Sequence, residues 1–315
     1  MVLIRVPATT ANLGPGFDTL GMALDMYNYM ELFESQSGLT IEVSGEGKHK
    51  IPKNISNLAI KSAFKVFEKI NYSPKGLTIK MYNNIPLGKG LGSSAAVIIG
   101  GMVAANIISG QQLDSDQLLN MASSMEGHPD NVAPALLGGI VVSAQLENEI
   151  VYRIIKPPPS LHTVVAIPDY ELQTRKARNV LPKEVPLANA VFNLSRTGLL
   201  LWAFLNEDLS LLSKVMDDRL HQPYRMSLVP GLENVFSRAK EEGALSVALS
   251  GAGPAVIAFS DNSNTKQIGE AMKEGFKEKN VDCTIKYLRP ITRGTEIIDM
   301  KGEYSYEHYC AKIRG

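Results

Sequence analysis

Cysteine is scarce in this sequence of 315 residues, and the two that occur, Cys283 and Cys310, form neither a disulfide framework nor a metal-binding spacing. This scarcity indicates a reducing compartment. An excess of charge is also missing, because 32 Lys+Arg balance 32 Asp+Glu. Binding to nucleic acids or anionic membranes relies on broad positive charge, so neither is the expected partner. A small molecule is the better expectation.

Long hydrophobic runs are absent as well. The longest, 95–105, contains two glycines and is shorter than the roughly 20 residues of a membrane-spanning helix. The first residues, 1–7, show no basic region followed by an apolar stretch, so they do not resemble a signal peptide. These absences predict a soluble, cytoplasmic protein.

The length of the chain favours two domains, each with its own core. Hydrophobic periodicity predicts mixed helices and strands up to the three prolines at 157–159, which suit neither a helix nor a central strand. We place the boundary there, giving domains 1–156 and 157–315. With two helices expected at 186–206 and 209–219 set aside, the second half has the order βαββαβ, which is the ferredoxin-like motif. The predicted class is α+β.

A glycine-rich segment, 86–96, is the sharpest feature and has the sequence PLGKGLGSSAA. It lies between a predicted strand at 77–81 and a predicted helix at 93–109. Backbone amides at such a helix N-terminus bind anions, and phosphate is the natural occupant. The spacing fits neither a P-loop nor a dinucleotide fingerprint, and a turn without a ligand is the alternative. The serine pair argues against that alternative, because a hydroxyl beside phosphates is a ready Mg²⁺ ligand.

Three segments together resemble the signatures of the GHMP kinase superfamily. They are 7–18 (PATTANLGPGFD), 86–96 and 249–255 (LSGAGPA), and they occur in the family's order. The resemblance implies an N-terminal domain like ribosomal protein S5 domain 2 and a C-terminal ferredoxin-like domain. It also implies ATP and Mg²⁺ as cofactors, and transfer of the γ-phosphoryl group to a hydroxyl of a small molecule.

Two further segments, 126–135 (EGHPDNVAPA) and 174–182 (TRKARNVLP), resemble those of the homoserine kinase family. The implied substrate is L-homoserine, phosphorylated in threonine biosynthesis. An ammonium group needs an acid, and a carboxylate suits a forked guanidinium. By this resemblance the substrate-binding residues are Asn12 and Asp18 for the ammonium, Arg178 and Arg225 for the carboxylate, and Thr174 for a further hydrogen bond.

Each of these residues also has a structural alternative. Asp18 could close the turn at 14–16, and Arg178 could cap a helix end. Arg225 stands in little local pattern. A lone histidine such as His128 is more often structural than functional.

The expected chemistry depends on positioning and charge stabilisation, with little covalent work for the protein. The catalytic candidates are Asn131, which would orient the hydroxyl, His128, which would add a hydrogen bond, and Asp130. Asp130 is a candidate general base, and the alternative is that the phosphate itself accepts the proton.

The segment 86–96 and one outside residue are expected to bind the nucleotide. These residues are Pro86, Leu87, Gly88, Lys89, Gly90, Leu91, Gly92, Ser93, Ser94, Ala95, Ala96 and Asn57. Lys89 would be a mobile charge at the loop rim or simply solvated, and Asn57 is equally placed to cap a helix at 57–70.

Mg²⁺ is expected on Ser94, or its neighbour Ser93, with Glu126 as the acidic ligand. Members of the superfamily often carry a glutamate about ten residues before the motif aspartate, and Asn120 stands there in this chain. Asn120, or water alone, is therefore the alternative.

The sequence leaves three alternative functions. Another small-molecule kinase of the GHMP type, or a non-catalytic ligand-sensing relative, would keep the same fold. A serine hydrolase lacks support because no G-x-S-x-G elbow occurs. The leucine-rich segment 191–205 around Trp202 predicts either a homodimer face or core packing.

Overall fold

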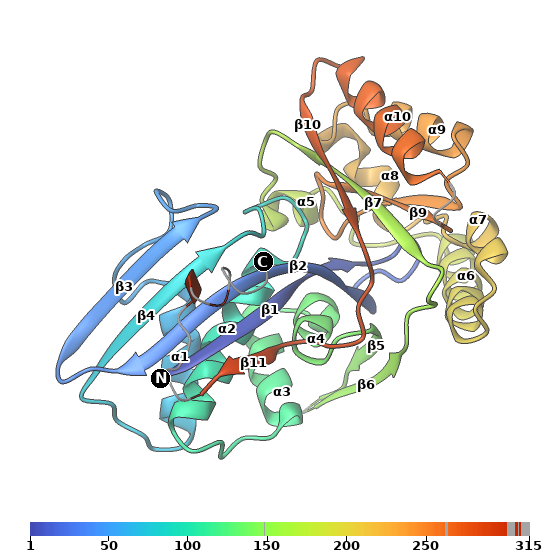
Figure 1. Ribbon diagram of the computed structural model, residues 1–315. Helices are drawn as coiled ribbons and strands as arrows, with labels where there is room; N and C mark the ends of the chain where they lie inside the picture. Colours follow the sequence, from blue (N-terminus) through green and yellow to red (C-terminus); the bar gives the residue numbers. More distant parts are fainter. Residues whose placement is uncertain (148, 262–263, 301–305, 308, 310–315) are drawn as a thin grey trace.

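The computed structural model describes residues 1–147, 149–261, 264–300, 306–307 and 309, and Figure 1 shows two sheets with their helices in that part of the chain. The first sheet has the order β11-β1-β2-β4-β3, with β5 pairing to β2 and β6 to β5. All its pairs are antiparallel except β3 with β4. Its strands are β1 (Val2–Ala11), β2 (Leu20–Glu34), β3 (Gly38–Gly45), β4 (Gly76–Asn83), β5 (Ile140–Gln145), β6 (Ile150–Ile155) and β11 (Glu296–Asp299).

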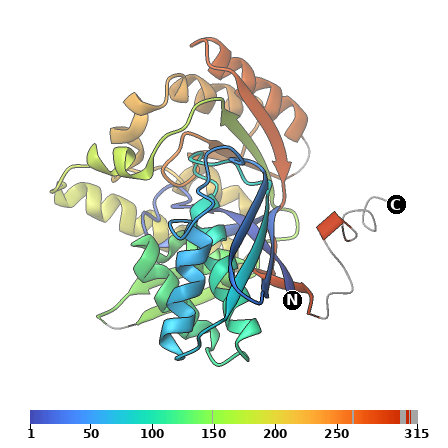
Figure 2. The same ribbon diagram turned by 90° about the vertical axis from the view of Figure 1, so that its left-hand side faces the viewer.

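Helices pack on one side of this sheet, as Figure 2 shows. They are α1 (Leu58–Lys69), α2 (Ser93–Ile108), α3 (Ser115–Glu126) and α4 (Pro129–Leu137). Asn57 and Asp114 begin α1 and α3 by accepting backbone N–H groups with their side chains, and Gln117 completes a capping box with Asp114. Most of α2 is apolar and buried, so it is the central helix of this layer.

The second sheet has the order β10-β7-β9-β8 and is antiparallel throughout. Helices α9 and α10 belong to this layer, and the order βαββαβ is confirmed. The elements are β7 (His162–Pro168), α9 (Leu232–Glu241), β8 (Ser246–Leu249), β9 (Val256–Ser260), α10 (Thr265–Lys277) and β10 (Cys283–Leu288). Between β7 and α9 the chain inserts α5 (Thr174–Asn179), α6 (Leu187–Leu205), α7 (Leu212–Val215), α8 (Gln222–Arg225) and two 3₁₀ turns, Leu209–Leu211 and Met226–Leu228.

The helix expected at 209–219 is wrong in its second half. The chain forms the 3₁₀ turn and α7, and then leaves helical geometry. The Asp218 carboxylate accepts the backbone N–H groups of Leu220, His221 and Gln222 at 2.6–2.9 Å. A short acidic side chain that bonds nearby N–H groups competes with helix formation, which explains the early end.

The two sheets share one large apolar cluster, and the second sheet has another of its own against α9 and α10. The chain changes sheet between β6 and β7, across the prolines at 157–159, yet β11 returns to pair with β1. Phe204, Ile257 and Phe259 belong to the same apolar cluster as the core of the first sheet. The boundary between 1–156 and 157–315 stays a prediction.

Candidate active site

One cavity collects most of the predicted site residues. The five substrate-binding, three catalytic and two metal candidates all line it, together with Pro86 and residues 88–94 of the glycine loop. Gly251 and Ala252 of the third signature also line it. The three signatures, which lie far apart in the sequence, thus meet at one place.

Four predicted nucleotide-binding residues do not line this cavity. Ala95 and Ala96 face the core, and Leu87 lines a neighbouring hollow. Asn57 is fully buried, where its Oδ1 accepts the N–H groups of Ala59 and Ile60. Asn57 is therefore the N-terminal cap of α1.

Glycines in the loop are required by close packing. Gly90 and Gly92 have φ values of +80° and +68°, which favour glycine. A Cβ on Gly90 would lie 2.1 Å from the carbonyl oxygen of Ser250, and one on Gly92 would lie 1.9 Å from Oγ1 of Thr9. The loop therefore sits directly against the first and third signatures.

The N-terminus of α2 opens toward the cavity without a side-chain cap. Gly92 holds the cap position, and the first turn contains no acidic residue. Its free amides and the helix dipole suit an anion. The two serines differ: Ser93 is buried and donates to the carbonyl of Ile85 at 3.3 Å, whereas the exposed Ser94 donates to Glu126 Oε2 at 2.8 Å.

Lys89 is neither a mobile charge nor a solvated lysine. Its Nζ donates to the carbonyl oxygens of Pro168 and Tyr170, at 2.6 and 2.8 Å. Burial lowers the pKa of Lys89 from its ordinary value. The side chain therefore binds the glycine loop to the end of β7 and to the residues that follow it.

The catalytic candidates form one hydrogen-bonded chain at the start of α4. Asn131 accepts from Thr9 Oγ1 at 2.8 Å and donates to Asp130 Oδ1 at 3.1 Å. The same Oδ1 contacts Nδ1 of His128 at 2.7 Å. Burial alone would lower the pKa of His128, but the hydrogen bond and charge of Asp130 outweigh it and raise that pKa. Asp130 thus orients both neighbours.

Asp18 and Arg178 are paired with each other. Arg178 Nη1 and Nη2 donate to the two carboxylate oxygens of Asp18 at 2.9 and 2.7 Å. Asn12 holds Asp18 in place, because its Oδ1 accepts the N–H of Asp18 and its Nδ2 donates to the carbonyl of Gly251. Thr174, the first residue of α5, lies at the same cavity.

Arg225 reaches the cavity from α8 while its side chain is almost fully buried, with 1% exposed. Its Nε donates to the carbonyl of Ala177 and its Nη1 to that of Gly251, both at 3.1 Å. Burial, and then the charge of Arg178, lower the pKa of Arg225 to about 10. It remains a cation at neutral pH.

The two expected Mg²⁺ ligands are of the chemical type that magnesium prefers, because both are oxygen donors. The Ser94 hydroxyl and the Glu126 carboxylate are adjacent oxygen donors beside the α2 N-terminus. The described residues contain no cluster of three His, Cys, Asp or Glu that would hold a metal alone, so phosphate oxygens and water would complete the shell. Asn120 lines a different hollow, and its Oδ1 accepts the N–H of Ile150.

Sequence reasoning did not single out Thr9 and His221. Thr9 lies inside the first signature, so its place beside Asn131 had a signal in the motif. His221 stands four residues before Arg225, and nothing in the sequence marks it as part of the site.

Comparison with known proteins supports the resemblance drawn from the motifs. The family model of the GHMP kinases N terminal domain matches residues 57–139, and that of the GHMP kinases C terminal domain matches residues 200–278. The fold is also that of a mevalonate kinase from L. major, with a TM-score of 0.68 over 92% of this chain and 96% of the other at 17% identity. Fold and site thus define a kinase of the GHMP type.

More similar proteins narrow the family. A homoserine kinase from Moorella thermoacetica is 50% identical over 298 residues, covering 95% of this chain and all of the relative. One from Carboxydothermus hydrogenoformans is 46% identical, covering 96% and 99%. The crystal structure of homoserine kinase from Cytophaga hutchinsonii superposes with a TM-score of 0.87 at 32% identity, covering 94% and 97%. The chain belongs to the homoserine kinase family.

Proposed function

We propose that this protein transfers the γ-phosphoryl group of ATP to the hydroxyl of L-homoserine, giving O-phospho-L-homoserine. The observation that carries the proposal is one cavity lined by two chemically different groups of residues. The uncapped N-terminus of α2 suits phosphates, and Asp18, Arg178 and Arg225 suit a zwitterion.

The Asp18–Arg178 pair explains how a zwitterion would bind. An amino acid brings its own ammonium for Asp18 and its own carboxylate for Arg178. Each protein charge would exchange its present partner for one of the same sign on the substrate, so no charge would be left unpaired. A neutral sugar or a hydroxy acid lacks one or both of these groups, which would disfavour it.

Asn131 is the residue we assign to the substrate hydroxyl. Its amide is fixed by Thr9 and Asp130, so it meets the hydroxyl in one orientation. Oδ1 of Asp130 is engaged by both Asn131 and His128, which favours an orienting role for Asp130 and leaves the proton to the phosphoryl oxygens.

Mg²⁺ is part of the proposal as a cofactor held by Ser94 and Glu126. Bound there, it would neutralise phosphate charge as transfer proceeds. Both side chains already lie 2.8 Å apart, which supports their joint use.

The test is ADP release with homoserine, mevalonate, shikimate, galactose and glycerol as acceptors. We expect turnover with homoserine to exceed the others by at least about a hundredfold, which is what a lost charge pair costs. Equal turnover of an acceptor that lacks an amino-acid group would indicate another GHMP-type kinase. No product with any acceptor would indicate the ligand-sensing alternative.

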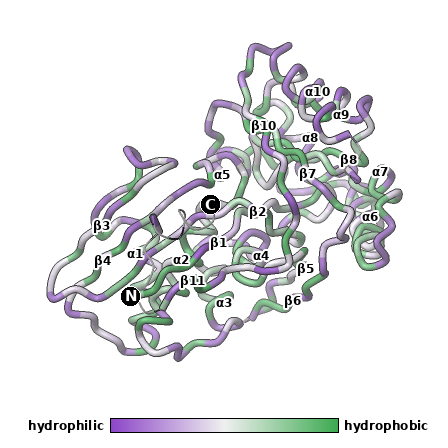
Figure 3. The backbone as a smooth tube through the Cα atoms, in the orientation of Figure 1, coloured by the Kyte–Doolittle hydropathy of each residue, from purple (hydrophilic) through white to green (hydrophobic). Residues whose placement is uncertain are grey.

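A homodimer remains a prediction, and α6 supports it. Leu187, Val191, Leu194, Trp202 and Leu205 are exposed along this helix, which Figure 3 shows as apolar at the edge of the molecule. A second copy is the occupant that fits best, because four of these positions, Val191, Leu194, Trp202 and Leu205, are placed symmetrically about Gly198. An antiparallel partner helix would place Leu194 opposite Trp202 and Val191 opposite Leu205.

A cytoplasmic location likewise stays a prediction. In the described residues no helix has the length and apolar character to cross a membrane.

A further inference from the structure

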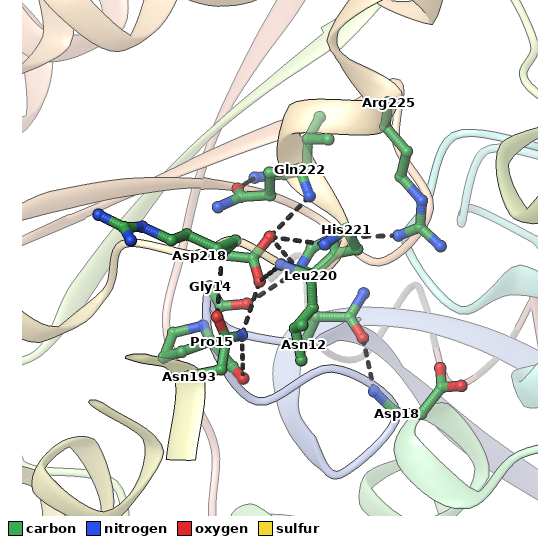
Figure 4. Close-up of polar contacts among 12 residues, drawn as sticks. Asn12, Gly14, Pro15, Asp18, Asn193, Asp218, Leu220, His221, Gln222 and Arg225 are labelled. Atoms are coloured by element: carbon green, nitrogen blue, oxygen red, sulfur yellow. Dashed lines mark hydrogen bonds and ion pairs between the residues drawn. The ribbon is translucent and has the colours of Figure 1, made fainter. Parts of the chain in front are cut away.

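A buried polar cluster lies behind Arg225, outside the residues assigned to the substrate (Figure 4). Its centre is His221, whose side chain is fully buried just before α8. Nε2 of His221 lies 2.8 Å from the carbonyl oxygen of Gly14, and Nδ1 lies 3.2 Å from Nη1 of Arg225. His221 therefore joins the turn of the first signature to Arg225, one of the proposed substrate-binding residues.

These two contacts fix the form of the ring. The carbonyl of Gly14 only accepts, so Nε2 must carry the proton, and the guanidinium only donates, so Nδ1 must be bare. The neutral Nε2–H imidazole satisfies both neighbours. A protonated ring would turn an N–H toward the N–H of Arg225 and lose that bond.

Several groups face this ring. Burial lowers the pKa of His221, as does the charge of Arg225, while Asp218 and Asp18 act in the opposite direction. The carboxylate of Asp218 lies 3.5 Å from Nε2 but is already engaged by three backbone N–H groups and by Asn193. The ring of Phe17 stacks on His221 with centroids 5.3 Å apart. The imidazole cannot turn without disturbing this packing.

His221 is one of the groups that fix the Arg225 guanidinium, and one nitrogen of that guanidinium, Nη2, is left for a ligand. Nε and Nη1 are engaged, whereas Nη2 makes no hydrogen bond to the described residues. No carboxylate of the described part of the chain forms an ion pair with Arg225 either. A buried cation with one unused donor at a cavity is arranged for an anionic ligand.

We propose that neutral His221 is a positioning residue, which holds the Arg225 guanidinium so that Nη2 faces the substrate carboxylate. The inference rests on the proposed function, because it takes homoserine as the ligand of Arg225. It also makes His221 the link between the two halves of the zwitterion site, since Gly14 lies in the turn between Asn12 and Asp18.

The test compares two replacements of His221. His221→Leu introduces an apolar side chain of similar length that makes no hydrogen bonds. His221→Gln supplies both an acceptor and a donor. We expect His221→Leu to raise the KM for homoserine about tenfold with the KM for ATP within twofold, and His221→Gln to recover most of the loss. His162→Leu, at the partly exposed start of β7, is the control and should leave both constants unchanged.

A double-mutant cycle with Arg225→Ala separates positioning from general stability. If His221 acts through Arg225, His221→Leu should change kcat/KM for homoserine less than twofold once Arg225 is Ala. An equal effect in both backgrounds, or equal rises in both KM values, would overturn the inference. If His221→Leu does not fold, His221→Asn, whose amide is too short to reach both neighbours, takes its place.

The two proposals fail in different ways. A wild-type protein that does not phosphorylate homoserine overturns the proposed function and this inference with it. A wild-type protein that does so, with His221→Leu and His221→Asn kinetically normal, overturns the positioning role alone.

Discussion

The ion pair between Asp18 and Arg178 contributes little to the free energy of unfolding. Each side chain is about a third exposed, 34% and 35%, although two hydrogen bonds join them. Ion pairs at such exposure are worth roughly 0–1 kcal/mol, because solvent screens them. In the proposed function the pair presents two opposite charges to the cavity that both residues line.

Replacing Arg178 should therefore affect binding more than folding. We expect Arg178→Ala to raise the KM for homoserine about thirtyfold or more, to leave the KM for ATP unchanged, and to change stability by less than about 1 kcal/mol. Arg178→Lys keeps the charge but loses the fork and should fall between. Steady-state kinetics with both substrates measure this, and unaltered homoserine kinetics would remove Arg178 from the site.

His128 should make stability depend on pH. Because Asp130 raises the pKa of His128 in the folded state, the pair stabilises the protein when His128 is protonated. That contribution is complete below the unfolded pKa of about 6.5 and disappears as the pH rises through the higher folded value. The wild type should exceed His128→Gln in free energy of unfolding more at pH 5.5 than at pH 9, measured with urea. The same difference at both values would contradict the pairing.

At the scale of elements, periodicity predicted the long helices and missed the short helices α4, α5 and α8. The helix α4 contains Pro134, which argues against a helix, but its start at Pro129 suits the first turn. The helices α5 and α8 have six and four residues and show too little periodicity to detect. Asp218 ended the expected helix at 209–219 through local hydrogen bonds to the next N–H groups, a competition that hydrophobic periodicity does not register.

The glycine loop gives a test with a matched control. Gly90→Ala and Gly38→Ala both place a side chain at a positive φ, +80° and +75°, but only at Gly90 does the new Cβ meet backbone. Both should lose roughly 1–2 kcal/mol from strain. Gly90→Ala should also raise the KM for ATP, because the loop must move away from Ser250. Equal kinetics in the two variants would mean that the loop tolerates displacement.

The exposed apolar face of α6 predicts that one introduced lysine would separate a dimer into monomers. Leu194 is 72% exposed at the middle of that face, so Leu194→Lys should convert a dimer to a monomer with little change in folding. Lys214→Ala, in α7, is a surface control. Sedimentation velocity measures the outcome, and a wild-type monomer would contradict the homodimer.

At the scale of the whole molecule, the sequence predicts two domains, whereas in the structure β11, from the second half of the chain, pairs with β1 in the first sheet. The prolines at 157–159 mark the change of sheet, but β11 was not expected, because its four residues follow a weakly patterned stretch. Arg5 on β1 holds Glu296 on β11 with two hydrogen bonds. Motifs located most of the site, whereas His221 depended on which segments meet in three dimensions.

A fragment of residues 1–156 should therefore not unfold cooperatively. It would lack β11 at the edge of β1 and the apolar residues that α6 and β9 add to the shared core. The full chain should show one thermal transition by calorimetry, with calorimetric and van't Hoff enthalpies in agreement. A fragment with its own sharp transition would favour two independent domains.

The hydrogen bonds that hold the glycine loop in place lower the entropy cost of binding a ligand there. The carbonyls of Gly88, Lys89 and Gly90 accept hydrogen bonds from Leu172, Ala255 and Ser250 of the second half of the chain, at 2.6–3.1 Å. Fixing the backbone of a free loop costs about 1–2 kcal/mol per residue, and here that entropy is lost during folding rather than on association. A triphosphate would meet amides that are already preorganised, so little of its contact energy would be spent on ordering the loop.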